Sequence, residues 1–216
     1  MKPLLNKITI AAAVVLGLAF FLETVFSGEE EINFVGANKC KICHNKAEEG
    51  AQFDIWSKVN HSQAYIRLAS PEAKEAGKKL GIDDPQKSPK CLKCHSTVYN
   101  WTEQPVKNID VKKDGSPRLS VEEGVSCESC HWAGSLYQPK KIMEDFDASV
   151  KAGMNPHPEE SCVKCHNQES PSWKNDRFSL ADGTKVGFDF KQAYEKIKHP
   201  NPKLEAAKAA KKATGK

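Results

Sequence analysis

The pattern Cys-x-x-Cys-His occurs four times in this chain and uses all eight of its cysteines. At this spacing two cysteines can form thioether bonds to a porphyrin while the histidine binds its iron. Disulfide frameworks, zinc sites and thioredoxin-like pairs also use paired cysteines, but none of them requires the histidine. The sequence therefore predicts four covalently bound haem c groups. Their attachment residues would be Cys40, Cys43 and His44; Cys91, Cys94 and His95; Cys127, Cys130 and His131; and Cys162, Cys165 and His166.

Four haems would dominate the interior of a chain of this size. Only 39% of its 216 residues are hydrophobic and 8% are aromatic, which is a lean supply for a core. Porphyrins would add large apolar surfaces that the side chains need not provide. The segments between the motifs are unlike one another, so the motifs do not mark a structural repeat. We expect residues 28–200 to form a single multihaem domain organised around its haems.

The N-terminus has the features of an export signal. Lys2 and Lys7 precede an uncharged, largely apolar run from Ile8 to Leu22. This run is shorter than an ordinary membrane span. Residues 1–27 are therefore either a signal peptide that is removed or an anchor that is retained in the inner membrane. Both alternatives place the body of the protein in the periplasm, and the second adds membrane association through the N-terminus.

Local patterns predict a mainly α fold with a few short β-hairpins. Ser70 and Pro71 form a helix start, with serine as the cap and proline in the first turn, and the helix is expected to reach Gly81. Residues 109–121 alternate apolar and polar around an Asp-Gly turn, which favours a hairpin, and residues 178–188 indicate a second one.

Two further regions have weaker patterns. The first motif opens a helical region, whereas residues 132–161 show only weak periodicity, and we expect the haems to organise them. Residues 201–216 form a basic tail that is either disordered or helical, and solvation or docking to an acidic partner would both suit its charge.

Three histidines lie outside the motifs and are candidates for the sixth ligand of an iron: His61, His157 and His199. His61 lies within, and His199 follows, a short stripe of apolar residues at helical spacing, which could hold the ring beside a haem. His157 lies between two prolines. Met143 and Met154 are further possible ligands, although packing is the commoner use of methionine. Three histidines cannot cap four irons, so at least one iron lacks a second histidine.

Charge argues against nucleic acid as a partner. The chain carries a formal net charge of +4. Each haem adds two propionates against about one positive charge on ferric iron, so four haems change the total by roughly −4. The haem-loaded protein would be close to neutral.

The order of these features resembles that of the tetrahaem cytochrome c-554 family. The resemblance implies a mostly α fold with close-packed porphyrin pairs, three irons with two histidines each, and one five-coordinate iron at the second haem. It rests on CKICH at 40–44 followed by Trp56 and HSQA at 61–64, GVSCESCH at 124–131, CVKCHNQESPSW at 162–173 and FDFKQAYEKIKH at 188–199.

The resemblance also implies which histidines pair. His61 would bind the iron of His166, His199 would bind the iron of His131, and the iron of His95 would stay open. The family carries the sixth ligand of the first haem shortly after the third motif, but that stretch here, WAGSLYQPKK at 132–141, has no histidine. His157 is then the remaining histidine for the first haem, and without it two irons would be open.

These observations favour a periplasmic electron carrier with no catalytic side chain. The expected partners are redox proteins, with a multihaem oxidoreductase as a possible donor and a membrane-bound or soluble cytochrome as a possible acceptor. One alternative is an enzyme that binds or reduces a small nitrogen oxide or peroxide at the open iron. Another is a conducting filament or a subunit of a membrane complex.

Overall fold

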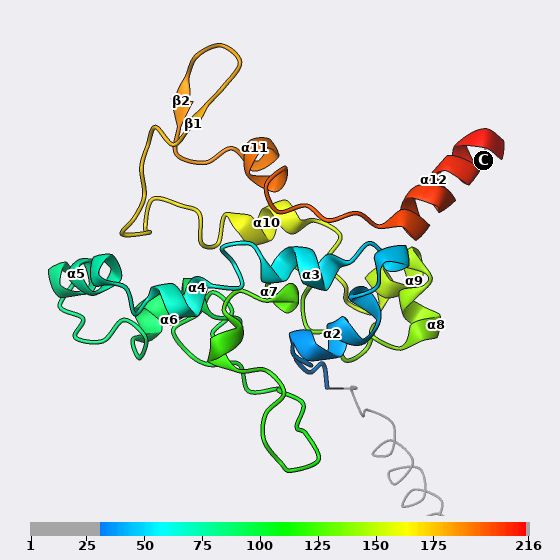
Figure 1. Ribbon diagram of the computed structural model, residues 1–216, viewed down its shortest axis with the longest axis horizontal. Helices are drawn as coiled ribbons and strands as arrows, with labels where there is room; N and C mark the ends of the chain where they lie inside the picture. The colour runs from blue at the N-terminus through cyan, green and yellow to red at the C-terminus, as the bar shows by residue number, and fades with distance from the viewer. Residues whose placement is uncertain (1–30, 215–216) are drawn as a thin grey trace, which may run out of the picture. The chain divides into compact units, whose positions relative to one another are not determined.

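Short helices joined by long irregular segments make up most of the structure (Figure 1). The computed structural model describes residues 31–214, and the signal or anchor predicted for residues 1–27 lies outside this range. From Ile32 onwards the chain forms one compact unit. Its helices are α2 (Ala37–His44), α3 (Gln52–Ser57), α4 (Ala64–Arg67), α5 (Pro71–Lys79), α6 (Pro89–His95), α7 (Cys127–His131), α8 (Lys140–Met143), α9 (Phe146–Lys151), α10 (Pro158–Cys162), α11 (Phe190–Tyr194) and α12 (Pro202–Thr214).

The haem-attachment motifs lie on short helices. Helices α2, α6 and α7 each end at the histidine of their motif. Helix α10 ends earlier, at Cys162, and the next turn carries the chain to His166, whose backbone N–H donates to the Cys162 carbonyl at 2.9 Å. The motif spacing therefore brings each histidine about one helical turn from its first cysteine.

The predicted start of α5 is confirmed in detail. Ser70 is the N-cap, its hydroxyl accepts a hydrogen bond from Ala73 N at 3.2 Å, and Pro71 occupies the first turn. The helix ends at Lys79, and Gly81 follows with a φ of +69°. A glycine in this conformation after the last turn is a common helix ending because it avoids the strain of a Cβ.

One of the two predicted hairpins forms as paired strands. Strands β1 (Phe178–Ser179) and β2 (Lys185–Val186) are antiparallel, as the pattern at 178–188 predicted. The hairpin expected at 109–121 is reduced to one isolated bridge, between Val111 and Pro117. Phe34 competes for this segment, since its backbone pairs with Asn108 and Asp110 at 2.8 and 2.9 Å.

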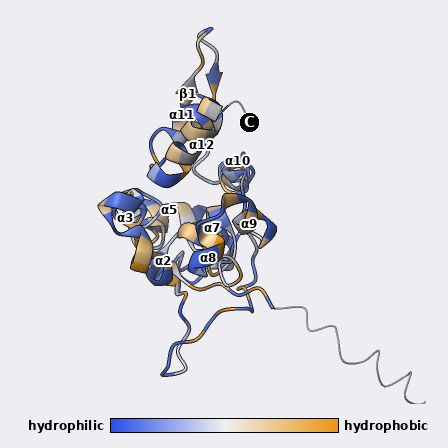
Figure 2. Ribbon diagram, turned by 90° about the vertical axis from the view of Figure 1, so that its right-hand side faces the viewer, coloured by the Kyte–Doolittle hydropathy of each residue, from blue (hydrophilic) through white to orange (hydrophobic). Residues whose placement is uncertain are grey.

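The described part of the chain supplies a small core of its own. Its buried large apolar side chains include Val35, Leu68, Leu92 and Leu119, and serines, a threonine and Glu128 are buried among them. Hydrophilic and hydrophobic residues are interspersed along most helices (Figure 2). The fold class is confirmed as mainly helical, with one short two-strand hairpin and much irregular chain. None of the helices within residues 31–214 has the length and apolar content of a membrane span.

Candidate haem sites

In two pairs of histidines the centres of the two rings lie at nearly the same separation. The centres of the His61 and His166 rings are 6.1 Å apart, and those of His131 and His199 are 5.9 Å apart. Two imidazoles that each bind one metal atom through a nitrogen at about 2 Å have ring centres about 6 Å apart. Each pair joins the histidine of a motif to a histidine from elsewhere in the chain. The two pairs therefore fit an iron held between them.

Burial keeps these four rings in the form that can bind a metal. Desolvation, with smaller contributions from the nearby His199 and His44, lowers the pKa of His131 to about 4. Desolvation is also the main cause that lowers the pKa of His61, His166 and His199. A histidine with a lowered pKa is neutral at neutral pH, and the neutral ring carries the lone pair that binds iron.

The remaining two motif histidines are oriented through their Nδ1 atoms. His95 Nδ1 lies 2.8 Å from the carbonyl oxygen of Ala64, at the start of α4. A carbonyl oxygen can only accept, so Nδ1 must carry the proton and Nε2 is left with the lone pair. His44 Nδ1 lies 3.2 Å from Gln52 Oε1. In both residues the nitrogen that would bind iron is Nε2.

His157 is not brought to another histidine within residues 31–214. It is exposed and precedes α10, and its backbone N–H donates to Asn155 Oδ1 at 2.9 Å. Its expected partner, His44, instead lies close enough to His131 and His199 to lower their pKa values. The structure thus brings together two of the three expected pairs. The assignment of His157 to the first haem stays a prediction.

The cysteines of different motifs approach one another in a definite order. A hydrogen bond from Cys40 is the largest cause raising the pKa of Cys127, and a hydrogen bond from Cys165 lowers the pKa of Cys94 to about 7. Desolvation, with a contribution from Cys162, raises the pKa of Cys130 to about 11. In a haem-loaded protein these sulfurs would be thioethers and would not titrate, so the interactions serve as a measure of proximity. They connect the motifs in the order first, third, fourth, second.

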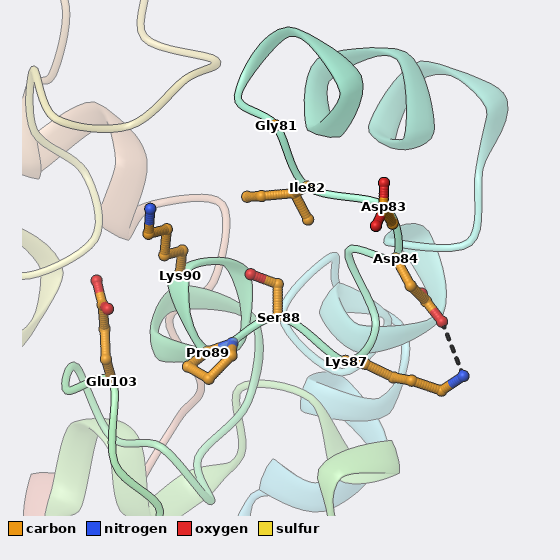
Figure 3. Close-up of a pocket in the computed structure, with 9 residues that line it drawn as sticks. All are labelled: Gly81, Ile82, Asp83, Asp84, Lys87, Ser88, Pro89, Lys90 and Glu103. Atoms are coloured by element: carbon orange, nitrogen blue, oxygen red, sulfur yellow. Dashed lines mark ion pairs between the residues drawn. The ribbon is translucent and has the colours of Figure 1, made fainter.

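No histidine ring within residues 31–214 faces His95. A surface pocket of about 400 Å³ lies beside its motif, lined by residues 81–84, residues 87–90 and Glu103. The lining carries charges of both signs, and Asp84 pairs with Lys87 at 3.1 Å (Figure 3). Residues 88–90 directly precede Cys91, so this pocket adjoins the second motif.

A buried carboxylate ties the first motif to the third. Glu128, the second residue of the third motif, is 1% exposed. Its Oε1 accepts hydrogen bonds from Val35 N at 2.9 Å and Gly134 N at 2.8 Å, and its Oε2 accepts one from Gly36 N at 2.9 Å. Burial raises the pKa of Glu128, whereas the three N–H donors directed at its two oxygens lower it and favour the ionised carboxylate. The chain entering α2 is thereby held against α7.

Sequence reasoning missed Glu128 and Gln52. Glu128 occupies a variable position of its motif, and only its partners, 92 and 93 residues away, reveal its role. Gln52 is the first residue of α3, where nothing in the local pattern distinguishes it from a solvent-facing glutamine. No local signal could have identified either residue.

Comparison with known proteins agrees with the chemistry of the motifs. Residues 39–132 match the family described as cytochrome c554 and c-prime. These residues form a domain of the cytochrome c554 family. No curated protein and no solved structure matches the chain.

The cytochrome c554 domain contains the first three motifs and His61. Membership of this family implies a multihaem c-type electron carrier with covalently bound haem c, outside the cytoplasm. The predicted family is therefore confirmed for residues 39–132. The fourth motif and His199, which the sequence resemblance also included, lie beyond the matched residues.

Proposed function

We propose that this protein is a periplasmic tetrahaem cytochrome that carries electrons between redox proteins. The two histidine pairs carry the proposal, since each has the ring separation of two ligands on one iron. The attachment cysteines of all four motifs are available for haem, because none of the eight forms a disulfide. Each haem would supply one iron centre that accepts and releases one electron.

The order of the motifs supports a route through the protein. Hydrogen bonds between Cys40 and Cys127 and between Cys94 and Cys165, and an electrostatic interaction between Cys130 and Cys162, connect the motifs in series. Because electron tunnelling weakens exponentially with the distance between cofactor edges, attachment sites this close favour transfer from haem to haem. The first and second motifs are at the two ends of the series. We propose that electrons enter at one of these haems and leave at the other.

The protein's own residues would set the potentials. His61 with His166, and His131 with His199, would make two irons bis-histidine, which favours lower potentials than histidine with methionine. The burial of these rings keeps them neutral and would limit the access of water to irons bound there. The donor and acceptor we propose are redox proteins, a multihaem oxidoreductase and a membrane-bound or soluble cytochrome.

Haem content and iron spin state test the proposal. The exported, haem-loaded protein should contain four haems by pyridine haemochrome absorbance. Electron paramagnetic resonance of the oxidised protein should show three low-spin irons and one high-spin iron, the latter at His95. Fewer than four haems, or the absence of two bis-histidine low-spin signals, would overturn the proposal.

The sixth ligand of the first haem can be assigned in the same experiment. With His157→Ala the number of high-spin irons should rise from one to two if His157 binds the iron of His44. If it stays at one, Met143 or Met154, both half-buried, becomes the candidate. In that case the potential of the first haem should lie above those of the bis-histidine haems.

Within residues 31–214 no other histidine ring lies opposite His95. This favours a second candidate function, the binding or reduction of a small nitrogen oxide or peroxide. The pocket beside the second motif, with Lys87 and Lys90 in its lining, could admit such a molecule. Steady turnover of nitrite, hydroxylamine or peroxide with a chemical reductant would support this function. Binding without turnover would leave electron transfer as the activity.

A further inference from the structure

Gln52 connects two of the candidate haem sites through a single side chain. It is the first residue of α3, it is 9% exposed, and both ends of its amide make hydrogen bonds. Its Oε1 lies 3.2 Å from His44 Nδ1. Its Nε2 donates to the carbonyl oxygen of Pro200 at 2.9 Å and also to the carbonyl oxygen of Glu49.

The partners of Gln52 determine how its amide is oriented. The two carbonyl oxygens can only accept hydrogen bonds, so the amide nitrogen must face them. The amide oxygen then faces His44, and His44 must donate from a protonated Nδ1. This leaves the lone pair of His44 on Nε2, the nitrogen expected to bind the first iron.

The other end of the amide holds the segment that follows His199. Pro200 directly succeeds His199, the candidate ligand of the third iron. Gly50, at a φ of +105°, lets the Pro200 carbonyl approach so closely that a Cβ would collide with it. Lys203 reinforces the contact through an ion pair with Glu49 at 2.7 Å. The segment around Pro200 is thus fixed against the loop that carries Gln52.

We propose that Gln52 is a positioning residue for two haems: it orients His44 on the first iron and, through Pro200, His199 on the third. This inference rests on the proposed function, because it takes both histidines to be iron ligands. Gln52 touches neither iron, and it acts through the imidazole of one ligand and the backbone beside the other. The same side chain would therefore influence the potentials of both haems.

Two substitutions should move the potential of the first haem in opposite directions. With Gln52→Glu, a carboxylate would accept the hydrogen bond from His44 Nδ1–H. The imidazole would then donate more electron density to the iron through Nε2, which favours ferric iron and lowers the potential. With Gln52→Leu the hydrogen-bond acceptor of His44 is lost. The imidazole then donates less electron density to the iron, and the potential of the first haem rises. A tenfold change in the ferric to ferrous ratio corresponds to a shift of about 59 mV for one electron. We expect a shift of about this size in each direction.

The experiment is a redox titration of the exported protein, followed by electron paramagnetic resonance so that the four haems are resolved. Gln104→Glu, an exposed glutamine substituted in the same way, is the matched control and should leave all four potentials unchanged. Opposite shifts of the first haem's midpoint in Gln52→Glu and Gln52→Leu, with a shift of the third haem's midpoint in both because both lose the amide donor to Pro200, support the positioning role. Shifts of the first haem's midpoint with the same sign in both variants, as general loosening of the loop would cause, overturn it.

The titration also separates this inference from the proposed function. If the wild-type protein loads fewer than four haems or lacks the bis-histidine signals, the proposed function fails before Gln52 is tested. If the wild-type protein meets those criteria and both Gln52 variants titrate like the control, the positioning role alone is wrong.

Discussion

Glu128 offers the clearest energetic test of how the haem motifs are held together. In Glu128→Gln the amide can keep one oxygen toward Val35 and Gly134, as Oε1 is now, but its NH2 group then meets the N–H of Gly36. The Gly36 N–H and the new amide NH2 are then both buried without an acceptor, and the charge that strengthens the other two bonds is lost. An unsatisfied buried donor costs about 1–3 kcal/mol, so we expect the free energy of unfolding to fall by about 2–3 kcal/mol.

Removal of the whole carboxyl group should cost more. In Glu128→Ala all three backbone donors lose their acceptor, and we expect a loss of about 4 kcal/mol or more. The assay is urea unfolding of the haem-loaded protein at pH 7, followed by tryptophan fluorescence. Glu122→Gln is the matched control, because Glu122 is exposed in the same region, and it should change stability by less than about 0.5 kcal/mol.

The three variants should lose stability in a definite order. Destabilisation should increase from Glu122→Gln to Glu128→Gln to Glu128→Ala. If Glu128→Gln matched the control, the three hydrogen bonds would contribute nothing net to stability. If Glu128→Ala were milder than Glu128→Gln, the cost would lie in the introduced amide and not in the lost acceptors. Either result would refute the account of Glu128 as the link between the first and third motifs.

Three further predictions address the haem ligands, the pH dependence and the backbone. His61→Ala should convert one low-spin iron to high-spin in the electron paramagnetic resonance spectrum, and an unchanged low-spin count would contradict its pairing with His166. Desolvation by burial raises the pKa of Glu123 from 4.5 to about 7, so the folded protein holds an extra proton between these values. The free energy of unfolding should therefore fall by about 3 kcal/mol as the pH rises through this window. Urea unfolding at pH 5 and pH 8 should show this fall in the wild-type protein and not in Glu123→Gln. Gly50→Ala should displace Pro200 and destabilise the protein by about 2 kcal/mol or more, because its φ of +105° and the close carbonyl both oppose a Cβ. A urea midpoint equal to that of the wild-type protein would show that the loop accommodates the added methyl group without a loss of stability.

The chemistry of the haem attachment could be predicted from the sequence because it is local. Two cysteines and a histidine within five residues lie about one helical turn apart in any short helix, so no distant contact is needed to assemble them. The Ser70-Pro71 helix start and the hairpin at 178–188 were predictable for the same reason, since their partners lie within a few residues. The hairpin at 109–121 forms only in part, because Phe34, a distant residue, takes the backbone N–H of Asp110, and antiparallel pairing is limited to the bridge between Val111 and Pro117.

The arrangement of the sites depends on tertiary structure. His61 and His166 are 105 positions apart in the sequence, and His131 and His199 are 68 apart. Local residue patterns extend over much shorter stretches and could not predict these pairs. The sequence supplied eight cysteines for haem attachment and seven histidines as candidate iron ligands, and through them the kind of protein this is. Long-range packing decided which rings lie opposite each other, that Glu128 joins the chain entering α2 to α7, and that Gln52 contacts His44. The physical reason is that covalent spacing determines geometry only within a turn or two, whereas contacts between distant segments follow from burial and hydrogen bonding in the folded chain.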